Sequence, residues 1–131
     1  MNILVYLDDL TYVVRGGRLP PNVKMIANLF RFRPILTANK IGKLKAAGIL
    51  FGRSNIIAKF TRFLGKKIKT DRKYRILIAH ANCKEKGIAL EKKILENYSN
   101  ILGSHLLDLG NGLGCHAGPG ALTIGLQEIV E

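Results

Sequence analysis

Residues 110–120 place five glycines within eleven positions, together with a single histidine, His116. Glycine adopts backbone angles that are closed to other residues and lets a ligand approach main-chain N–H groups closely. Successive N–H groups turned inward form an anion-binding concavity, to which a histidine ring can add a hydrogen bond. The segment is therefore either a tight connection between two strands or a binding site for a carboxylate or phosphate, and its composition leaves both interpretations open.

The length of 131 residues is enough for one domain with one core. Hydrophobic residues make up 47% of the chain and charged residues 23%, which is typical of a globular protein. No apolar run approaches the roughly 20 residues needed to cross a bilayer, so we expect no stable membrane insertion. The N-terminus lacks the basic segment and cleavage site of a signal peptide, so the expected location is cytoplasmic. Cys83 and Cys115 are too few for a disulfide framework, and we expect free thiols.

Positive charge is concentrated in one part of the sequence. The chain carries 21 Lys and Arg against 9 Asp and Glu, a formal net charge of +12. Twelve of the basic residues lie between positions 40 and 75, against the single acidic residue Asp71. This asymmetry indicates an acidic partner, which could be nucleic acid, a membrane surface or another protein, unless the segment is only a solvated face that aids solubility.

The aromatic residues of this basic segment argue against specific nucleic-acid binding. They are Phe51, Phe60, Phe63 and Tyr74. Phe60 and Phe63 fall on the apolar face of a predicted helix, so the four rings do not form an exposed row on which bases could stack. The charge alone supports no more than a nonspecific electrostatic attraction to nucleic acid.

The hydrophobic pattern predicts an α/β (α+β) domain of two layers, in which a mixed sheet of five or six strands carries helices on one face. Strands are expected at residues 34–38, 43–51, 75–79, 105–109 and 121–126, the first two forming a hairpin. Helices are expected at about residues 7–15, 23–30, 56–64 and 84–98. Because the first helix begins so close to the N-terminus, the pattern leaves no room for a strand ahead of it. Proline at position 34 can begin a strand but not interrupt one.

Two of these helices have a recognisable apolar face. In the helix at 56–64 the residues that share this face are Ile56, Ile57, Phe60, Phe63 and Leu64. Lysine and arginine decorate its other side, so it could lie on a membrane surface, although packing into the core is the simpler use of the apolar face. In the helix at 84–98 the residues expected to face inward are Ala89, Ile94, Leu95 and Tyr98.

Residues that catalysis or metal binding would require do not occur at useful spacings. Cys115 and His116 are adjacent, and adjacent side chains of an extended chain point to opposite faces. Asp108 is the only nearby acid that could orient such a pair. The histidines show no helical metal-binding spacing, and no phosphate-binding or dinucleotide-binding motif occurs. We therefore expect a binding protein, with no catalytic residue, no metal and no cofactor.

Six short motifs occur in a fixed order along the chain. They are Gly16-Gly17-Arg18, Arg33-Pro34-Ile35-Leu36, Gly42-Lys43-Leu44, Gly52-Arg53, His80-Ala81 and the run from Gly114 to Leu122. Together they resemble the C-terminal domain of the DegV family of bacterial fatty-acid-binding proteins. The similarity covers nearly the whole chain, and the closing His-Ala-Gly-Pro-Gly-Ala-Leu is its most specific element.

The resemblance implies a protein of two α/β domains that hold one long-chain fatty acid between them, with its carboxylate near the domain junction and its acyl tail in apolar surroundings. It also implies a separate fatty-acid kinase that forms acyl-phosphate for phospholipid synthesis, so that the binding protein is not itself an enzyme. By matching motifs, His116 would belong to the polar network at the carboxylate, and Gly118 and Gly120 would shape the adjacent loop. Arg18 and Arg53 would lie on the face that meets the kinase or guards the head group.

The chain departs from the family in one large respect. The N-terminal domain, whose Ser and Thr hydroxyls hold the carboxylate, is absent from residues 1–131, so we expect a single C-terminal domain that is a fragment, a separately expressed domain or the product of a split gene. Such a domain alone would bind fatty acid weakly or not at all. The alternative function is that of a small basic nucleic-acid-binding domain. No motif specifies the acyl length, the particular kinase or the oligomeric state.

Overall fold

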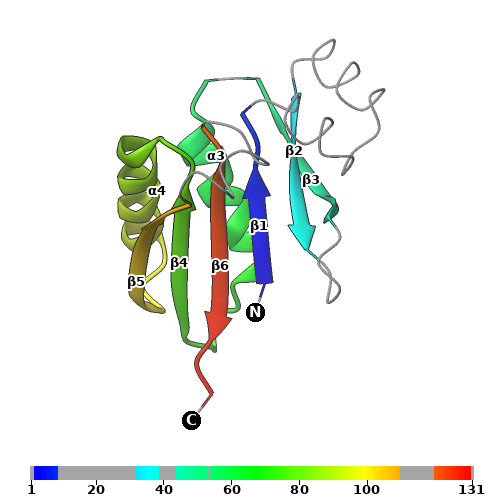
Figure 1. The fold of residues 1–131 in the computed structure, drawn as a ribbon. Helices are drawn as coiled ribbons and strands as arrows, with labels where there is room; N and C mark the ends of the chain where they lie inside the picture. The colour runs from blue at the N-terminus through cyan, green and yellow to red at the C-terminus, as the bar shows by residue number, and fades with distance from the viewer. Residues whose placement is uncertain (1, 9–31, 39–43, 53, 110–119, 131) are drawn as a thin grey trace.

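The computed structural model describes residues 2–8, 32–38, 44–52, 54–109 and 120–130. Within these ranges one six-stranded mixed sheet has the strand order β3-β2-β1-β6-β4-β5, and helices α3 and α4 lie on one face of it (Figure 1). The predicted two-layer α/β architecture is confirmed. The strands are β1 (Asn2–Tyr6), β2 (Phe32–Ala38), β3 (Leu44–Phe51), β4 (Tyr74–His80), β5 (Ile101–Asp108) and β6 (Leu122–Glu128), and the helices are α3 (Ile56–Leu64), which a 3₁₀ turn at Gly65–Lys67 extends, and α4 (Lys84–Asn97).

Strand β1 contradicts the expectation that no strand fits ahead of the first helix. Its five residues lie in the middle of the sheet, antiparallel to both β2 and β6. A strand this short suffices because the partners on both sides satisfy its backbone groups, while Leu4 and Tyr6 enter the core. Leu7 and Asp8 are not helical. The remainder of the helix predicted at 7–15, and the whole of that at 23–30, lie outside the described residues.

The predicted hairpin is present as the antiparallel pair of β2 and β3. Strand β2 begins two residues earlier than expected, so Pro34 lies within the strand and does not begin it. The pairs between β2 and β1 run only from Ile35 to Thr37. The missing N–H of Pro34 therefore costs no hydrogen bond to β1, and the strand tolerates proline at this position.

The core lies between the sheet and the two helices. The apolar face of α3 enters it as predicted, with Phe60, Phe63 and Leu64 buried and Ile56 and Ile57 partly buried against it. The two helices also contact each other, and the hydroxyl of Tyr98, just after α4, donates a hydrogen bond of 2.8 Å to the carbonyl of Thr61 in α3. Neither helix of the described ranges is long and apolar enough to cross a membrane.

The predicted inward face of α4 is only partly right. Ile94 is buried and Tyr98, just after the helix, packs against the core as expected, whereas Ala89 and Leu95 are exposed and Gly87 and Leu90 are buried in their place. Gly87 explains the difference, because a Cβ atom there would lie 3.0 Å from Leu106 of β5. A glycine at the centre of the contact lets the helix approach the sheet closely, and the buried row follows from that position at i, i+3 and i+7.

Gly48 of β3 provides a test of the packing between sheet and helix. A Cβ atom at this position would overlap the ring of Phe63, which is only 8% exposed. Gly48→Ala is therefore expected to lower the free energy of unfolding by about 1–3 kcal/mol, the usual cost of overpacking a core. Denaturant titration measures the effect.

Gly103→Ala in β5 is the matched control, since the nearest atom to its Cβ, Cγ of Arg75, is 3.9 Å away. The control is expected to change stability by less than about 0.5 kcal/mol. Equal stability of the two variants would show that α3 does not press on β3 at Gly48.

Candidate functional site

Several strand ends meet at one edge of the sheet. The C-terminal ends of β1, β4 and β5 lie there with the N-terminal end of β6, because β6 is antiparallel to β1 and β4 while β5 is parallel to β4. The backbone of residues 80 and 81 ties this edge together. The N–H of Leu109 donates to the carbonyl of His80 at 2.9 Å, the N–H of Gly120 donates to the carbonyl of Ala81 at 2.9 Å, and Ala81 itself donates to Ala121 at 3.0 Å.

Residues Leu109 and Gly120 are the described neighbours of the glycine-rich segment 110–119. Gly120 has a φ of +89°, a backbone conformation that other residues rarely adopt, and a Cβ atom there would lie 2.9 Å from Cβ of Asp8. The expectation that Gly120 helps to shape the loop remains a prediction, and the positive φ and the close approach to Asp8 both require glycine at this position. His116, Gly118, Arg53 and Arg18 lie outside the described residues.

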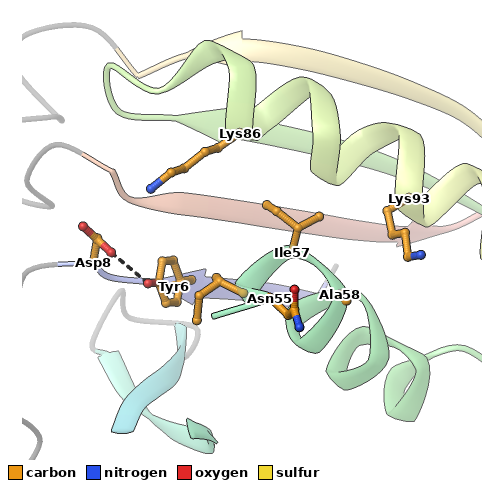
Figure 2. Close-up of a pocket in the computed structure, with 8 residues that line it drawn as sticks. Tyr6, Asp8, Asn55, Ile57, Ala58, Lys86 and Lys93 are labelled. Atoms are coloured by element: carbon orange, nitrogen blue, oxygen red, sulfur yellow. Dashed lines mark hydrogen bonds between the residues drawn. The ribbon is translucent and has the colours of Figure 1, made fainter. Parts of the chain in front are cut away.

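A pocket of about 450 Å³ opens next to this edge, between the two helices and the end of β1 (Figure 2). Its size lies within the range of small-molecule sites. The hydroxyl of Tyr6 donates a 2.9 Å hydrogen bond to the carboxylate of Asp8, which holds both side chains at one end of the pocket. The lining residues are Tyr6, Asp8, Asn55, Ile56, Ile57, Ala58, Lys86 and Lys93.

The walls of the pocket differ in character. The start of α3 contributes apolar surface through Ile56, Ile57 and Ala58, whereas α4 contributes the amines of Lys86 and Lys93, which are two helical turns apart on the same side (Figure 2). An apolar surface beside two cations suits a ligand that has both a hydrocarbon part and an anionic group.

His80 and Cys83 lie near this edge, and both are residue types that catalytic sites use. In this structure a backbone hydrogen bond engages the ring of His80, and the environment of Cys83 favours the protonated thiol. His80 is buried, and its Nδ1 accepts a hydrogen bond of 3.3 Å from the N–H of Cys83. Burial raises the pKa of the Cys83 thiol, so the thiol stays protonated at neutral pH. The described residues include no group of three or more His, Cys, Asp or Glu side chains that could hold a metal ion.

Sequence reasoning missed most of the pocket. Tyr6 and Asp8 lie at the end of a strand that was not predicted, and Lys86 and Lys93 resemble other exposed lysines in the sequence. Their spacing of seven residues on one helix was the only local signal. The prediction for the aromatic residues is confirmed, since Phe60, Phe63 and Tyr74 are buried and cannot form a stacking surface.

The fold is shared with DegV family proteins of known structure, several of which are described as fatty-acid-binding. The chain superposes on a fatty-acid-binding DegV family protein of Streptococcus agalactiae with a TM-score of 0.77 and 23% identity, covering 96% of this chain and 44% of that protein. It matches a DegV family protein of Thermus thermophilus, described as fatty-acid-binding, with a TM-score of 0.79 and 20% identity, covering 97% and 45% of the two chains.

Sequence comparison gives the family directly. The protein-family model described as "Uncharacterised protein, DegV family" matches residues 1–128 of the sequence. The chain therefore belongs to the DegV family. A DegV domain-containing protein of Streptococcus pneumoniae is 29% identical over 131 residues, covering 96% of this chain and 44% of that protein. A relative from Clostridium perfringens is 30% identical over 119 residues, covering 90% and 40%. The chain therefore spans less than half the length of these curated relatives.

The conformation of Gly120 predicts a measurable cost of substitution. Gly120→Ala would force alanine into positive φ and press its methyl group against Asp8, so we expect a loss of about 1–3 kcal/mol in the free energy of unfolding. Thermal and denaturant unfolding would measure it. A loss no larger than that of Gly103→Ala would contradict this account of the site.

The raised pKa of Cys83 predicts slow alkylation. Only a thiolate reacts with iodoacetamide, so Cys83 in the folded chain should react several times more slowly at pH 7.5 than in urea-unfolded chain. The rate should rise as pH increases beyond the usual thiol pKa. A Cys115→Ser variant isolates the signal, and mass spectrometry follows it. If the folded chain reacted as fast as the unfolded chain, the Cys83 thiol would be neither shielded from the reagent nor raised in its pKa.

Proposed function

We propose that the chain is the C-terminal domain of a cytoplasmic fatty-acid-binding protein, and that it binds part of a long-chain fatty acid together with an N-terminal domain of the same protein. Membership of the DegV family supports this, as do the names of several similar structures. One of these, from Eubacterium eligens, was solved loaded with heptadecanoic acid and matches with a TM-score of 0.74 and 20% identity, covering 97% of this chain and 45% of that protein.

The pocket beside the end of β1 is the observation that carries the proposal. Its wall of Ile56, Ile57 and Ala58 offers apolar surface to an acyl chain, and Lys86 and Lys93 offer positive charge at the rim. The pocket also lies at the edge of the sheet to which both neighbours of segment 110–119 are bonded. An acyl chain here would therefore lie at the same edge as Leu109 and Gly120, the described neighbours of the segment in which the polar head-group residues are expected.

The head group is assigned to residues of the family motifs. In the proposal, His116 and Arg53 contact the carboxylate, Gly118 and Gly120 shape the loop beside it, and Arg18 with Arg53 faces the partner protein. That partner is a fatty-acid kinase, which converts the bound fatty acid to acyl-phosphate. The chain itself presents the ligand and performs no catalytic step.

The energetics assign different tasks to the tail and the head. Burying about fifteen methylene groups contributes about 12 kcal/mol at roughly 0.8 kcal/mol each, against an association cost of about 4–15 kcal/mol. The tail thus provides affinity, and the head-group contacts prevent an unpaired buried carboxylate. If residues 1–131 bury only part of the tail, the free energy gained from burial no longer exceeds the association cost. We therefore expect weak binding by residues 1–131 alone.

Photolabelling tests the proposal even when binding is weak. A palmitic acid analogue with a diazirine on its acyl chain, added at high micromolar concentration, should label the peptides that contain Tyr6 and residues 56–58. Unlabelled palmitate should compete. Ile57→Glu replaces apolar wall with a carboxylate that competes with the fatty-acid head group for Lys86 and Lys93, and it should reduce labelling by about fivefold or more, because desolvating that carboxylate against the acyl chain costs about 1 kcal/mol or more. Peptide mass spectrometry measures the label.

Two further variants separate the pocket from general effects. Ala58→Leu narrows the pocket without adding charge and should also reduce labelling. Ile88→Glu adds the same charge to α4 outside the pocket lining, at a residue that is 46% exposed, and should leave labelling unchanged. Labelling spread over the surface, insensitive to palmitate and to Ile57→Glu, would contradict the proposal. Tight binding of an oligonucleotide, lost steeply as salt rises, would favour the nucleic-acid alternative instead.

A further inference from the structure

A second concave surface lies between strand β3 and helix α3. We call it the β3–α3 groove, and its volume is about 270 Å³. It shares no lining residue with the pocket, so an occupant here would not contact the residues proposed to bind fatty acid in the pocket. The residues that line the groove are Ile49, Leu50, Phe51, Lys59, Arg62, Phe63 and Lys66.

Strand β3, which borders the groove, exposes two apolar side chains. Phe51 is 69% exposed and Ile49 is 47% exposed, although both are large hydrophobic residues. Leu50, between them in sequence, is buried on the helix-covered face with Phe63 and belongs to the core, so Ile49 and Phe51 point to the opposite face of β3. Two large apolar side chains exposed together on an edge strand are typical of a surface that another molecule covers.

The helix side of the groove is a row of cations. Lys59, Arg62 and Lys66 lie at i, i+3 and i+7 along α3 and its 3₁₀ extension. The Lys59 ammonium donates a hydrogen bond to the backbone carbonyl of Phe51, and the Lys66 ammonium lies 5.1 Å from the centre of the Phe63 ring. These two contacts hold the charges against the groove.

Among the described residues that line the groove none is acidic, and the sequence contains neither Asp nor Glu between positions 44 and 70. The first turn of α3 has no acidic residue either. The one ion pair found among the described side chains joins Arg72 to Glu128, outside the groove. The charge of the groove therefore matches a negatively charged occupant.

The position of β3 at the edge of the sheet indicates the shape of the molecule that could bind in the groove. It is the outermost strand of the sheet, and within the described residues nothing pairs with its outer edge (Figure 1). A free strand edge beside a narrow groove accepts an extended polypeptide, whose side chains alternate between two faces. A flat membrane surface would reach the exposed Phe51 but would not fill a concave groove.

We propose that the β3–α3 groove binds an acidic, extended segment of a protein partner. The segment runs along the free edge of β3, with its apolar side chains on the face of Ile49 and Phe51 and its carboxylates on the opposite face, where they pair with Arg62, Lys66 and Lys59. The partner is thus defined by alternating acidic and apolar residues.

Fluorescence anisotropy with a defined probe tests this inference. The probe is a labelled ten-residue peptide of alternating Val and Glu with blocked ends, and the comparison peptide has Gln in place of Glu. We expect the Glu peptide to bind and the Gln peptide to bind at least about tenfold more weakly. The double variant R62E/K66E should weaken Glu-peptide binding by about tenfold or more, since two attractive charge pairs become repulsive. Phe51→Ser should also weaken it.

Lys92→Glu provides the matched control, because Lys92 is exposed on α4 and lines neither the groove nor the pocket. It should change the affinity by less than about twofold, within the small effect of an isolated surface charge. Equal affinity of R62E/K66E and the unaltered chain would overturn the proposal. So would binding to phosphatidylglycerol vesicles that depends on Phe51 and Arg62 in the absence of peptide binding, since the groove would then be a membrane contact. Palmitate photolabelling of R62E/K66E should be unchanged, which keeps this result separate from that of the fatty-acid proposal.

Discussion

The antiparallel pairing of β1 with β6 is the constraint on which the rest of the fold depends. Residues from the two extremes of the sequence meet here, with Leu4 opposite Ile124 and Tyr6 opposite Leu122. These side chains form the middle of the core, and the other four strands add to either side of the pair. Such long-range pairing requires a loss of chain entropy on loop closure before its contacts form. The two ends of the sequence must therefore come together cooperatively as the domain folds.

Local patterns predicted the elements whose residues repeat with a clear period. The apolar face of α3, the strand β4 and the hairpin of β2 and β3 were all recognisable in this way. Strand β1 was missed because Leu7, Leu10 and Val13 continue the apolar run at helical spacing and obscure the short strand ahead of them. The pocket was missed for a related reason, since Tyr6 and Lys86 become neighbours only through the strand order, which no local period encodes.

Helix α3 serves both concave surfaces of the domain. Its first turn lines the pocket through Ile56, Ile57 and Ala58, and the turns that follow line the groove through Lys59 and Arg62. The buried face between them, with Phe60 at its centre, fixes the helix against the sheet. A single nine-residue helix therefore sets the geometry of two surfaces with different chemistry.

The position of β1 and β6 also has a mechanical consequence. Asn2 pairs with Leu126, so the beginning of β1 and the end of β6 lie side by side at the same edge of the sheet (Figure 1). A force that pulls the two termini apart would load this pair at one end and open its hydrogen bonds one after another. Strands loaded in that way resist far less than strands pulled in shear, where all the hydrogen bonds share the load. The domain is thus expected to yield by unzipping of its two central strands, although their inward side chains are buried in the core.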